Sequence, residues 1–129
     1  MTDSKTDYLE NALLDHVLRN TAFTSPATVY VGLYTVAPTD VGAGTEVTGG
    51  SYARQATTFG VAASGSTSNT GTVAFPTATA PWGTVVAMGI FDAVSAGNLL
   101  YYGNLAVSKI VGNGDTISFA GGALTVSET

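Results

Sequence analysis

The hydrophobic pattern divides the chain into one helical run near the start and a longer series of short strand-like runs. In the first run, four positions have the spacing of one helix face, and most acidic residues lie on the other side. These positions are Leu9, Leu13, His16 and Val17. Ser4 followed by Asp7 resembles a capping box, so the pattern predicts an amphipathic helix over Lys5–Arg19. A helix of about 15 residues is marginal alone in water, so its apolar face must be covered.

After residue 27, short runs of apolar and β-branched residues are separated by segments rich in Gly, Ser, Thr and Asn. In the first of them, Val29, Val31 and Leu33 alternate with Tyr30 and Tyr34. The predicted strands are Thr28–Thr35, Ser51–Phe59, Thr72–Phe75, Gly83–Phe91, Leu99–Tyr102, Leu105–Val111, Thr116–Phe119 and Ala123–Ser127. The strongest hairpin signal is Gly112–Asp115, because its Asn-Gly pair suits a type I′ turn.

One helix followed by eight short strands predicts a mainly β protein, a jelly-roll-like β-sandwich with one N-terminal amphipathic α-helix. We assign residues 1–24 to the helix and its connection, and residues 25–129 to the β-sandwich body. The two parts are expected to form a single structural domain, because 129 residues are close to the usual domain size of roughly 100–150.

Charged residues are scarce and mainly acidic. They make up 10% of the chain, against about 25% in typical domains, and the net charge is -5. This balance argues against direct contact with nucleic acid, because DNA binding requires Lys and Arg to neutralise phosphates. It argues equally against contact with a membrane through a polybasic segment, because such a segment needs clustered Lys and Arg. The chain has no Cys, which excludes disulfides and Cys-based zinc sites.

Few residues offer catalytic chemistry. His16 is the only histidine, and a general base also needs a nucleophile and an orienting group, so we expect it to be packed or interfacial. Asp40 and Glu46 lie in the Pro38–Gly50 loop and could supply a calcium site or an acid–base pair, although an exposed loop explains them better. We therefore predict no enzyme activity, no cofactor, and no catalytic or metal-binding residues.

Aromatic residues are better candidates for contact surfaces than for chemistry. They could form a sugar-stacking or protein-binding surface, or they could fill the sandwich core. Tyrosines on a Thr-rich face are typical of protein interfaces, and for Trp82 the two interpretations are evenly balanced. The residues predicted to lie at an interface are Leu9, Leu13, His16, Val17, Tyr30, Tyr34 and Trp82.

Eight segments in fixed order resemble a family of small virion structural proteins of tailed phages, whose members are often labelled tail fibre proteins. The likeness covers nearly the whole chain. Its segments are Tyr8–His16, Pro26–Tyr34, Gly49–Arg54, Phe75–Thr79, Trp82–Thr84, Gly89–Asp92, Gly97–Leu100 and Ser118–Thr125.

The resemblance implies a non-enzymatic component of the virion, assembled in the host cytoplasm. Low charge, no Cys and a β-rich body suit a protein that is built into a shell or an appendage. Small phage proteins of this build often serve as capsid decoration or cement proteins, so we expect a protein that stabilises the outer shell. As partners we expect other copies of the chain, as a homotrimer, and the major capsid protein or another virion protein. The alternative is a tail component, such as a fibre, tip or adaptor domain, that acts in tail assembly or binds a host receptor.

Overall fold

Most of the regular structure consists of antiparallel strands. The computed structural model describes residues 2–128, with 40% of the chain in strands and 10% in helix. The predicted fold class, a mainly β sandwich with one N-terminal helix, is confirmed. In chain order the elements are β1 (Thr2–Lys5), α1 (Asp7–Leu18), β2 (Val29–Val36), β3 (Thr45–Glu46), β4 (Gln55–Thr57), β5 (Ser66–Ser68), β6 (Val73–Ala74), β7 (Gly83–Phe91), β8 (Leu99–Val111), β9 (Ser118–Phe119) and β10 (Thr125–Ser127).

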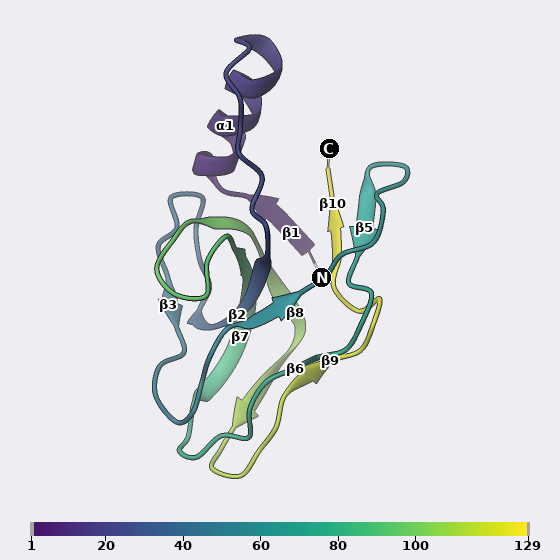
Figure 1. Ribbon diagram of the computed structural model, residues 1–129. Coiled ribbons are helices and arrows are strands. Elements are labelled where there is room, and N and C mark those ends of the chain that lie inside the picture. The colour runs from purple at the N-terminus through teal and green to yellow at the C-terminus, as the bar shows by residue number, and fades with distance from the viewer. Residues whose placement is uncertain (1, 129) are drawn as a thin grey trace.

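A large antiparallel sheet forms one layer of the sandwich (Figure 1). Its strand order is β1-β8-β7-β2-β3, and β4 also pairs with β2. Two small ladders, β5 with β10 and β6 with β9, supply strands to the facing layer. Val31 and Leu33 of β2 meet Phe75, Ile117 and Leu124 in the core between the layers. Burying an apolar side chain of this size contributes about 1.5–3 kcal/mol, so this core is the main source of stability.

Both faces of β2 are covered. Val31 and Leu33 point into the sandwich core, as the predicted alternation requires. Tyr34 packs on the opposite face of the sheet in a second cluster with Phe91 and Leu99. This second face lies beneath the site described below.

The helix is shorter than predicted at both ends. It spans Asp7–Leu18 instead of Lys5–Arg19. The preceding residues form β1, which pairs antiparallel with β8 and sets Lys5 opposite Tyr101. Pairing with the edge of β8 satisfies the backbone of this segment better than one more helical turn would, because the first N–H groups of a helix have no partner within it.

Thr6, instead of the predicted Ser4, caps the helix and fastens it to the sheet. Its hydroxyl accepts a hydrogen bond from the Leu9 N–H at 3.4 Å and donates one to the Leu99 carbonyl at 2.7 Å. Thr6 is only 2% exposed. The cap therefore also fixes where α1 leaves the sheet.

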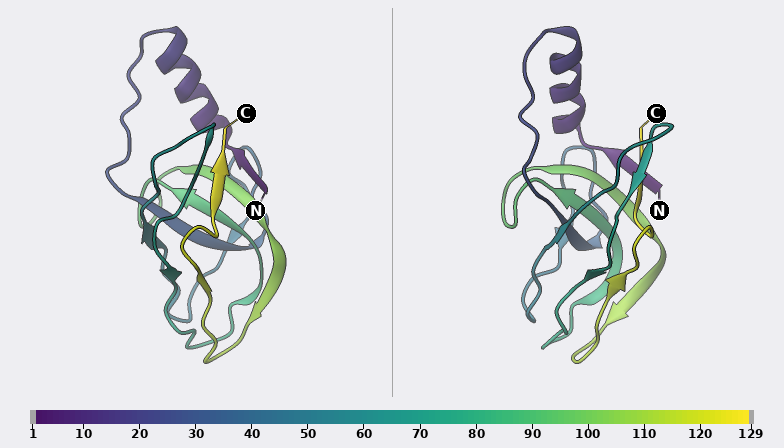
Figure 2. Two further views of the ribbon diagram at one scale, coloured as in Figure 1. Left: turned by 90° about the vertical axis from the view of Figure 1, so that its right-hand side faces the viewer. Right: turned by 45° about the vertical axis from the view of Figure 1, so that its right-hand side comes forward.

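Beyond its first turn, α1 projects away from the β layers, as Figures 1 and 2 show from three directions. The chain then returns beside the helix, where the Phe23 N–H donates a hydrogen bond to His16 Nδ1 at 3.2 Å. Leu9 is buried, whereas Leu14, Val17 and Leu18 are 56%, 73% and 74% exposed. The helix thus has an apolar side that its own chain does not cover.

A turn forms at Gly112–Asp115 as predicted, but it is not of type I′, because Gly114 has a positive φ (88°) and Asn113 does not. It also does not join two paired strands. The Asp115 N–H donates to the Gly112 carbonyl at 3.0 Å, and the Asp115 carboxylate accepts from the Gly112 N–H at 2.8 Å. The following strand, β9, pairs with β6 in the facing layer, with Phe119 opposite Val73. The turn therefore carries the chain from one layer to the other, because Ile117 is buried in the core between them.

Candidate functional site

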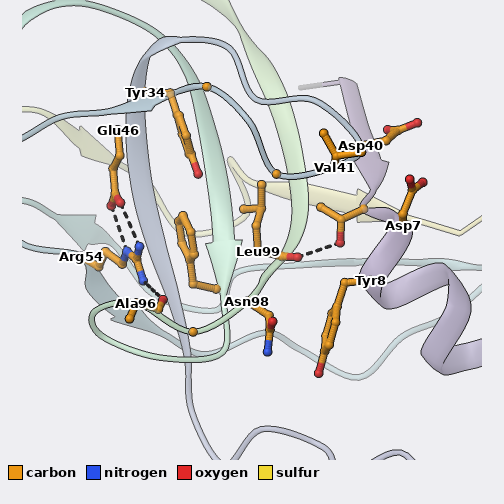
Figure 3. Close-up of a pocket in the computed structure, with 15 residues that line it drawn as sticks. Asp7, Tyr8, Tyr34, Asp40, Val41, Glu46, Arg54, Ala96, Asn98 and Leu99 are labelled. Atoms are coloured by element: carbon orange, nitrogen blue, oxygen red, sulfur yellow. Dashed lines mark hydrogen bonds and ion pairs between the residues drawn. The ribbon is translucent and has the colours of Figure 1, made fainter.

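A hollow of about 640 Å³ opens where the start of α1 meets the ends of three strands (Figure 3). Residues 6–8 at the helix N-terminus form one wall, and part of the loop between β2 and β3 forms another. The loop between β7 and β8 closes a third side. The floor is formed by Tyr34 and Phe91, whose rings stack with centroids 6.1 Å apart and an interplanar angle of 11°.

An ion pair between Glu46 and Arg54 lies at one side of the hollow. Arg54 Nε donates to Glu46 Oε2 at 2.9 Å, and Nη2 donates to Oε1 at 2.8 Å. The Arg54 side chain is 10% exposed and that of Glu46 is 22% exposed. Two-point pairs of this kind hold both side chains in a fixed orientation.

The Arg54 guanidinium also organises the loop between β7 and β8. Nη1 donates to the carbonyls of Ala93 at 3.0 Å and Ala96 at 2.8 Å. Its carbon lies 3.5 Å from the centre of the Phe91 ring, within the range of a cation–π contact. Burial opposes the charged form of the Arg54 guanidinium. The hydrogen bonds to Glu46 and the negative charge of Glu46 outweigh this effect and raise the pKa of Arg54.

Tyr52 joins this ion pair to the sandwich core. Its hydroxyl donates to Glu46 Oε2 at 2.6 Å and accepts from the Leu33 N–H at 2.9 Å. Its ring packs edge-on against Trp82, with centroids 5.5 Å apart. Burial, followed by the hydrogen bond to Glu46, strongly raises the pKa of Tyr52. Burial also raises the pKa of Tyr34, to about 12, so both phenols stay neutral under physiological conditions.

Position 32 requires a glycine, because the surrounding side chains of Glu46, Phe91 and Tyr52 leave no room for a Cβ atom. A Cβ atom there would lie 2.8 Å from Glu46 Oε2 and 2.8 Å from Phe91 Cε1. It would also lie 2.9 Å from the Tyr52 hydroxyl oxygen. The glycine therefore lets three side chains converge over the middle of β2.

The opposite side of the hollow is held by Asp40. Its carbonyl accepts a hydrogen bond from the Asp7 N–H at 2.8 Å, and its carboxylate accepts one from the Tyr102 hydroxyl. That hydrogen bond, with some burial, raises the pKa of Tyr102. The loop between β2 and β3 is thus tied both to the helix N-terminus and to β8.

The arrangement is suited to contact with a polar partner and is poorly suited to proton transfer. Exposed groups at the rim, from Asp7, Tyr8 and Asn98, can accept or donate hydrogen bonds. The Glu46 carboxylate is instead occupied by Arg54 and Tyr52. Among residues 2–128, no three His, Cys, Asp or Glu side chains are grouped closely enough to hold a metal ion.

Comparison with known protein families matches residues 4–127 to the family described as Podophage GP4 fiber I protein gp80. The chain belongs to this gp80 fibre family. It is accordingly a structural protein of a phage virion, as the resemblance implied. A search of curated proteins finds no match to the chain. Within the part of the chain that the structure describes, no helix is both long and apolar enough to cross a bilayer.

The structure of this gp80 family member separates the predicted interface residues into two groups. Leu9, Tyr34 and Trp82 are between 4% and 6% exposed, so the chain itself covers them. Trp82 belongs to the sandwich core, and its Nε1 donates to the Gly50 carbonyl at 2.9 Å. Tyr34 forms the floor of the hollow. These three side chains stabilise the fold, and only their small exposed parts could contact a partner.

The other four predicted residues remain accessible to different extents. Leu13 and Tyr30 are half-buried, whereas His16 and Val17 are exposed on α1. His16 Nδ1 accepts a backbone hydrogen bond, so this side chain holds the returning segment against the helix. An interface at these four residues remains a prediction.

The sequence interpretation missed the role of Glu46 and Arg54. It treated Glu46 as part of an exposed loop, but the ion pair and Tyr52 hold this residue in place. The available signal was the scarcity of charge. Residues 21–129 of this gp80 family member contain only two basic residues, Arg54 and Lys109, and a lone Arg eight positions from a Glu is a reasonable partner for it.

Proposed function

We propose that the protein is a non-enzymatic structural subunit of a phage fibre, carried on the tail of the particle. The match to a fibre family over residues 4–127 is the observation that carries this proposal. It favours the tail alternative over the capsid decoration role expected from composition. The name of the family describes a fibre and gives no position on a shell.

The geometry of the hollow supports a structural role. Glu46, Arg54 and Tyr52 are engaged with one another, and Asp40 is engaged with Tyr102. These contacts join β3 to the segment before β4, and the β2–β3 loop to β8. Arg54 also binds carbonyls of the β7–β8 loop, and the Asp40 carbonyl binds the start of α1. A rigid framework of this kind maintains the shape of a contact surface, whereas a hydrolase needs an acid and a base facing the same space.

Fibres are often long chains with repeats, and this chain is short and unrepeated. A fibre of such subunits would contain several copies or additional proteins. The predicted homotrimer fits this arrangement, and so do contacts with another virion protein. Leu14, Val17 and Leu18 on α1 provide apolar surface that such contacts would cover.

The test is the position and copy number of the protein on purified particles. Antibody labelling in electron micrographs should mark the tail, and quantitative mass spectrometry should give far fewer copies than the major capsid protein. Particles that lack the protein should lose adsorption to the host and keep their heat resistance. Labelling over the whole shell, with copies comparable to the major capsid protein and early DNA loss on heating, would support the decoration role and reject the tail proposal.

A further inference from the structure

Two uncovered apolar surfaces lie at opposite ends of the molecule. The first is the apolar tip of α1, formed by Leu14, Val17 and Leu18, which are between 56% and 74% exposed. They follow a spacing of three and four residues, so they share one side of the helix. A helix that leaves large apolar side chains uncovered in water is unusual, because an apolar stripe normally faces a core.

The second surface is a shallow hollow of about 270 Å³ beside β8, here called the β8 groove. Its lining is largely apolar and includes Leu105, Val107, Lys109, Ile117, Phe119 and Leu124. The volume is below the roughly 300–1,000 Å³ of small-molecule pockets, so the groove suits a few side chains better than a ligand. In all three views, α1 and the C-terminal part of β8 are at opposite ends (Figures 1 and 2).

A large bulge in β8 exposes the rim of this groove. Val85 pairs with Lys109 and Ala87 with Asn104, so residues 105–108 of β8 lie opposite the single residue 86 of β7. The bulge interrupts the ladder and turns Val107 outward, where it is 80% exposed. Ile110, just beyond it, is 74% exposed.

The charges beside the two surfaces are opposite. Glu10 lies one helical turn before Leu14 on the exposed side of α1, and it forms no ion pair among the described residues. Lys109 lines the β8 groove and, among the same residues, forms no ion pair either. The other basic residues, Lys5, Arg19 and Arg54, are each paired with a carboxylate.

We propose that copies of this chain associate head to tail, with the apolar tip of α1 in the β8 groove of the next copy. An amphipathic helix end entering an apolar groove is a common mode of recognition. One copy cannot make this contact with itself, because its two surfaces are at opposite ends. Packing α1 against α1 in parallel would bring the Glu10 side chains together, whereas the groove offers Glu10 a cation.

A head-to-tail contact uses two different surfaces, so it repeats from copy to copy and builds either a closed ring or an open filament. A ring of three would agree with the predicted homotrimer, and an open array would agree with a fibre. The contact depends on the surfaces alone and does not require the proposed tail location.

The experiment uses the full chain and sedimentation velocity over a concentration series. The wild-type protein should form larger species as its concentration rises. Leu18→Asp in the tip and Val107→Asp in the groove should each leave only monomers. Both side chains are exposed, so circular dichroism and thermal unfolding should match the wild type. Val61→Asp is the matched control, since Val61 is 98% exposed and belongs to neither surface, and it should associate like the wild type.

Mixing the two monomeric variants separates a head-to-tail contact from a symmetric one. Leu18→Asp keeps an intact groove and Val107→Asp keeps an intact tip, so an equimolar mixture should form a species of two chains and no larger one. Loss of association with Leu18→Asp but not with Val107→Asp would mean that the helices pack on each other or on another protein, and would overturn the proposal. A wild-type protein that remains monomeric at every concentration would overturn it as well.

Charge reversal provides a second measurement that does not depend on the Asp variants. Glu10→Lys and Lys109→Glu should each weaken association, by roughly two- to fivefold in Kd for an exposed pair. The double variant should recover most of the loss. Additive weakening in the double variant would show that these two residues do not face each other, and would contradict the proposed orientation.

Discussion

Arg54 is bound to Glu46 at two points, with Nε–Oε2 and Nη2–Oε1 distances of 2.9 and 2.8 Å. The same guanidinium holds the Ala96 carbonyl, 42 positions away in sequence, at 2.8 Å. One cation therefore joins β3, the segment before β4 and the loop between β7 and β8. In a chain with four basic residues, Arg54 thus makes the contacts that hold these three segments together at one side of the hollow.

Removing that cation should destabilise the fold. We expect Arg54→Ala to lower the free energy of unfolding by about 2–3 kcal/mol, less than the roughly 3–5 kcal/mol of a fully buried pair. Arg54→Lys should lose about half as much, because an ammonium keeps the charge but not the two-point geometry. Urea unfolding measures both. Arg19→Ala, which removes an exposed pair, should change stability by about 0.5 kcal/mol or less; an equal loss there would contradict this interpretation.

Adding a methyl group at Gly32 should disturb the packing of Glu46, Phe91 and Tyr52 over β2. Gly32→Ala places a Cβ within 2.9 Å of Glu46, Phe91 and Tyr52, so we expect a loss of about 1–3 kcal/mol from overpacking. Gly60→Ala is the control, because the nearest atom to its Cβ would be 3.6 Å away. Thermal unfolding of both variants gives the comparison. If Gly32→Ala were as stable as Gly60→Ala, the cluster would be looser than the structure indicates.

Thr6 should control how firmly α1 is attached. Thr6→Val keeps the shape of the side chain but removes the cap to Leu9 and the hydrogen bond to the Leu99 carbonyl. We expect the free energy of unfolding to fall by about 1–2 kcal/mol. Relative to the wild type, hydrogen exchange should become faster in the first turn of α1, with a smaller change in β7. Thr24→Val, at an exposed position, should leave exchange in α1 unchanged. Uniformly faster exchange across the whole chain would show that Thr6 acts on global stability alone.

Glu128 should make stability depend on pH in the acid range. It is bound by Lys5 and by the Tyr101 hydroxyl, joining the last strand region to β1 and β8. Partial burial opposes the charged form, but these two hydrogen bonds lower the pKa of Glu128 below its ordinary value of 4.5. A carboxylate with a lowered pKa contributes stability above its unfolded pKa, and this contribution is lost as the pH falls through the folded value.

The measurement is the difference in unfolding free energy between the wild type and Glu128→Gln as the pH is lowered. The difference should be constant at neutral pH and should shrink below pH 4.5, where the unfolded state begins to bind the proton. Glu10→Gln, an exposed carboxylate on α1, should show no comparable trend. A difference for Glu128→Gln that grows in acid would mean that the contact to Lys5 does not form.

The sequence by itself determined the features that depend on local spacing. Helical periodicity located α1 to within two residues at each end, and alternation in β2 correctly separated Val31 and Leu33 from Tyr34. The Asn-Gly pair located the turn at Gly112–Asp115. These features follow from backbone geometry over a few residues, and neighbouring side chains are sufficient to specify them.

Tertiary structure decided which of these elements meet. Lys5 and Glu128 are 123 positions apart, and Tyr102 and Asp40 are 62 apart, so no local pattern could pair them. The same holds for β9, which pairs with β6 and not with the strand before its turn. The tertiary structure also decided that Trp82 is buried while Leu18 is exposed, although both side chains are large and apolar. Burial depends on what packs against a side chain, and that is fixed only when the two layers and the projecting helix are placed together.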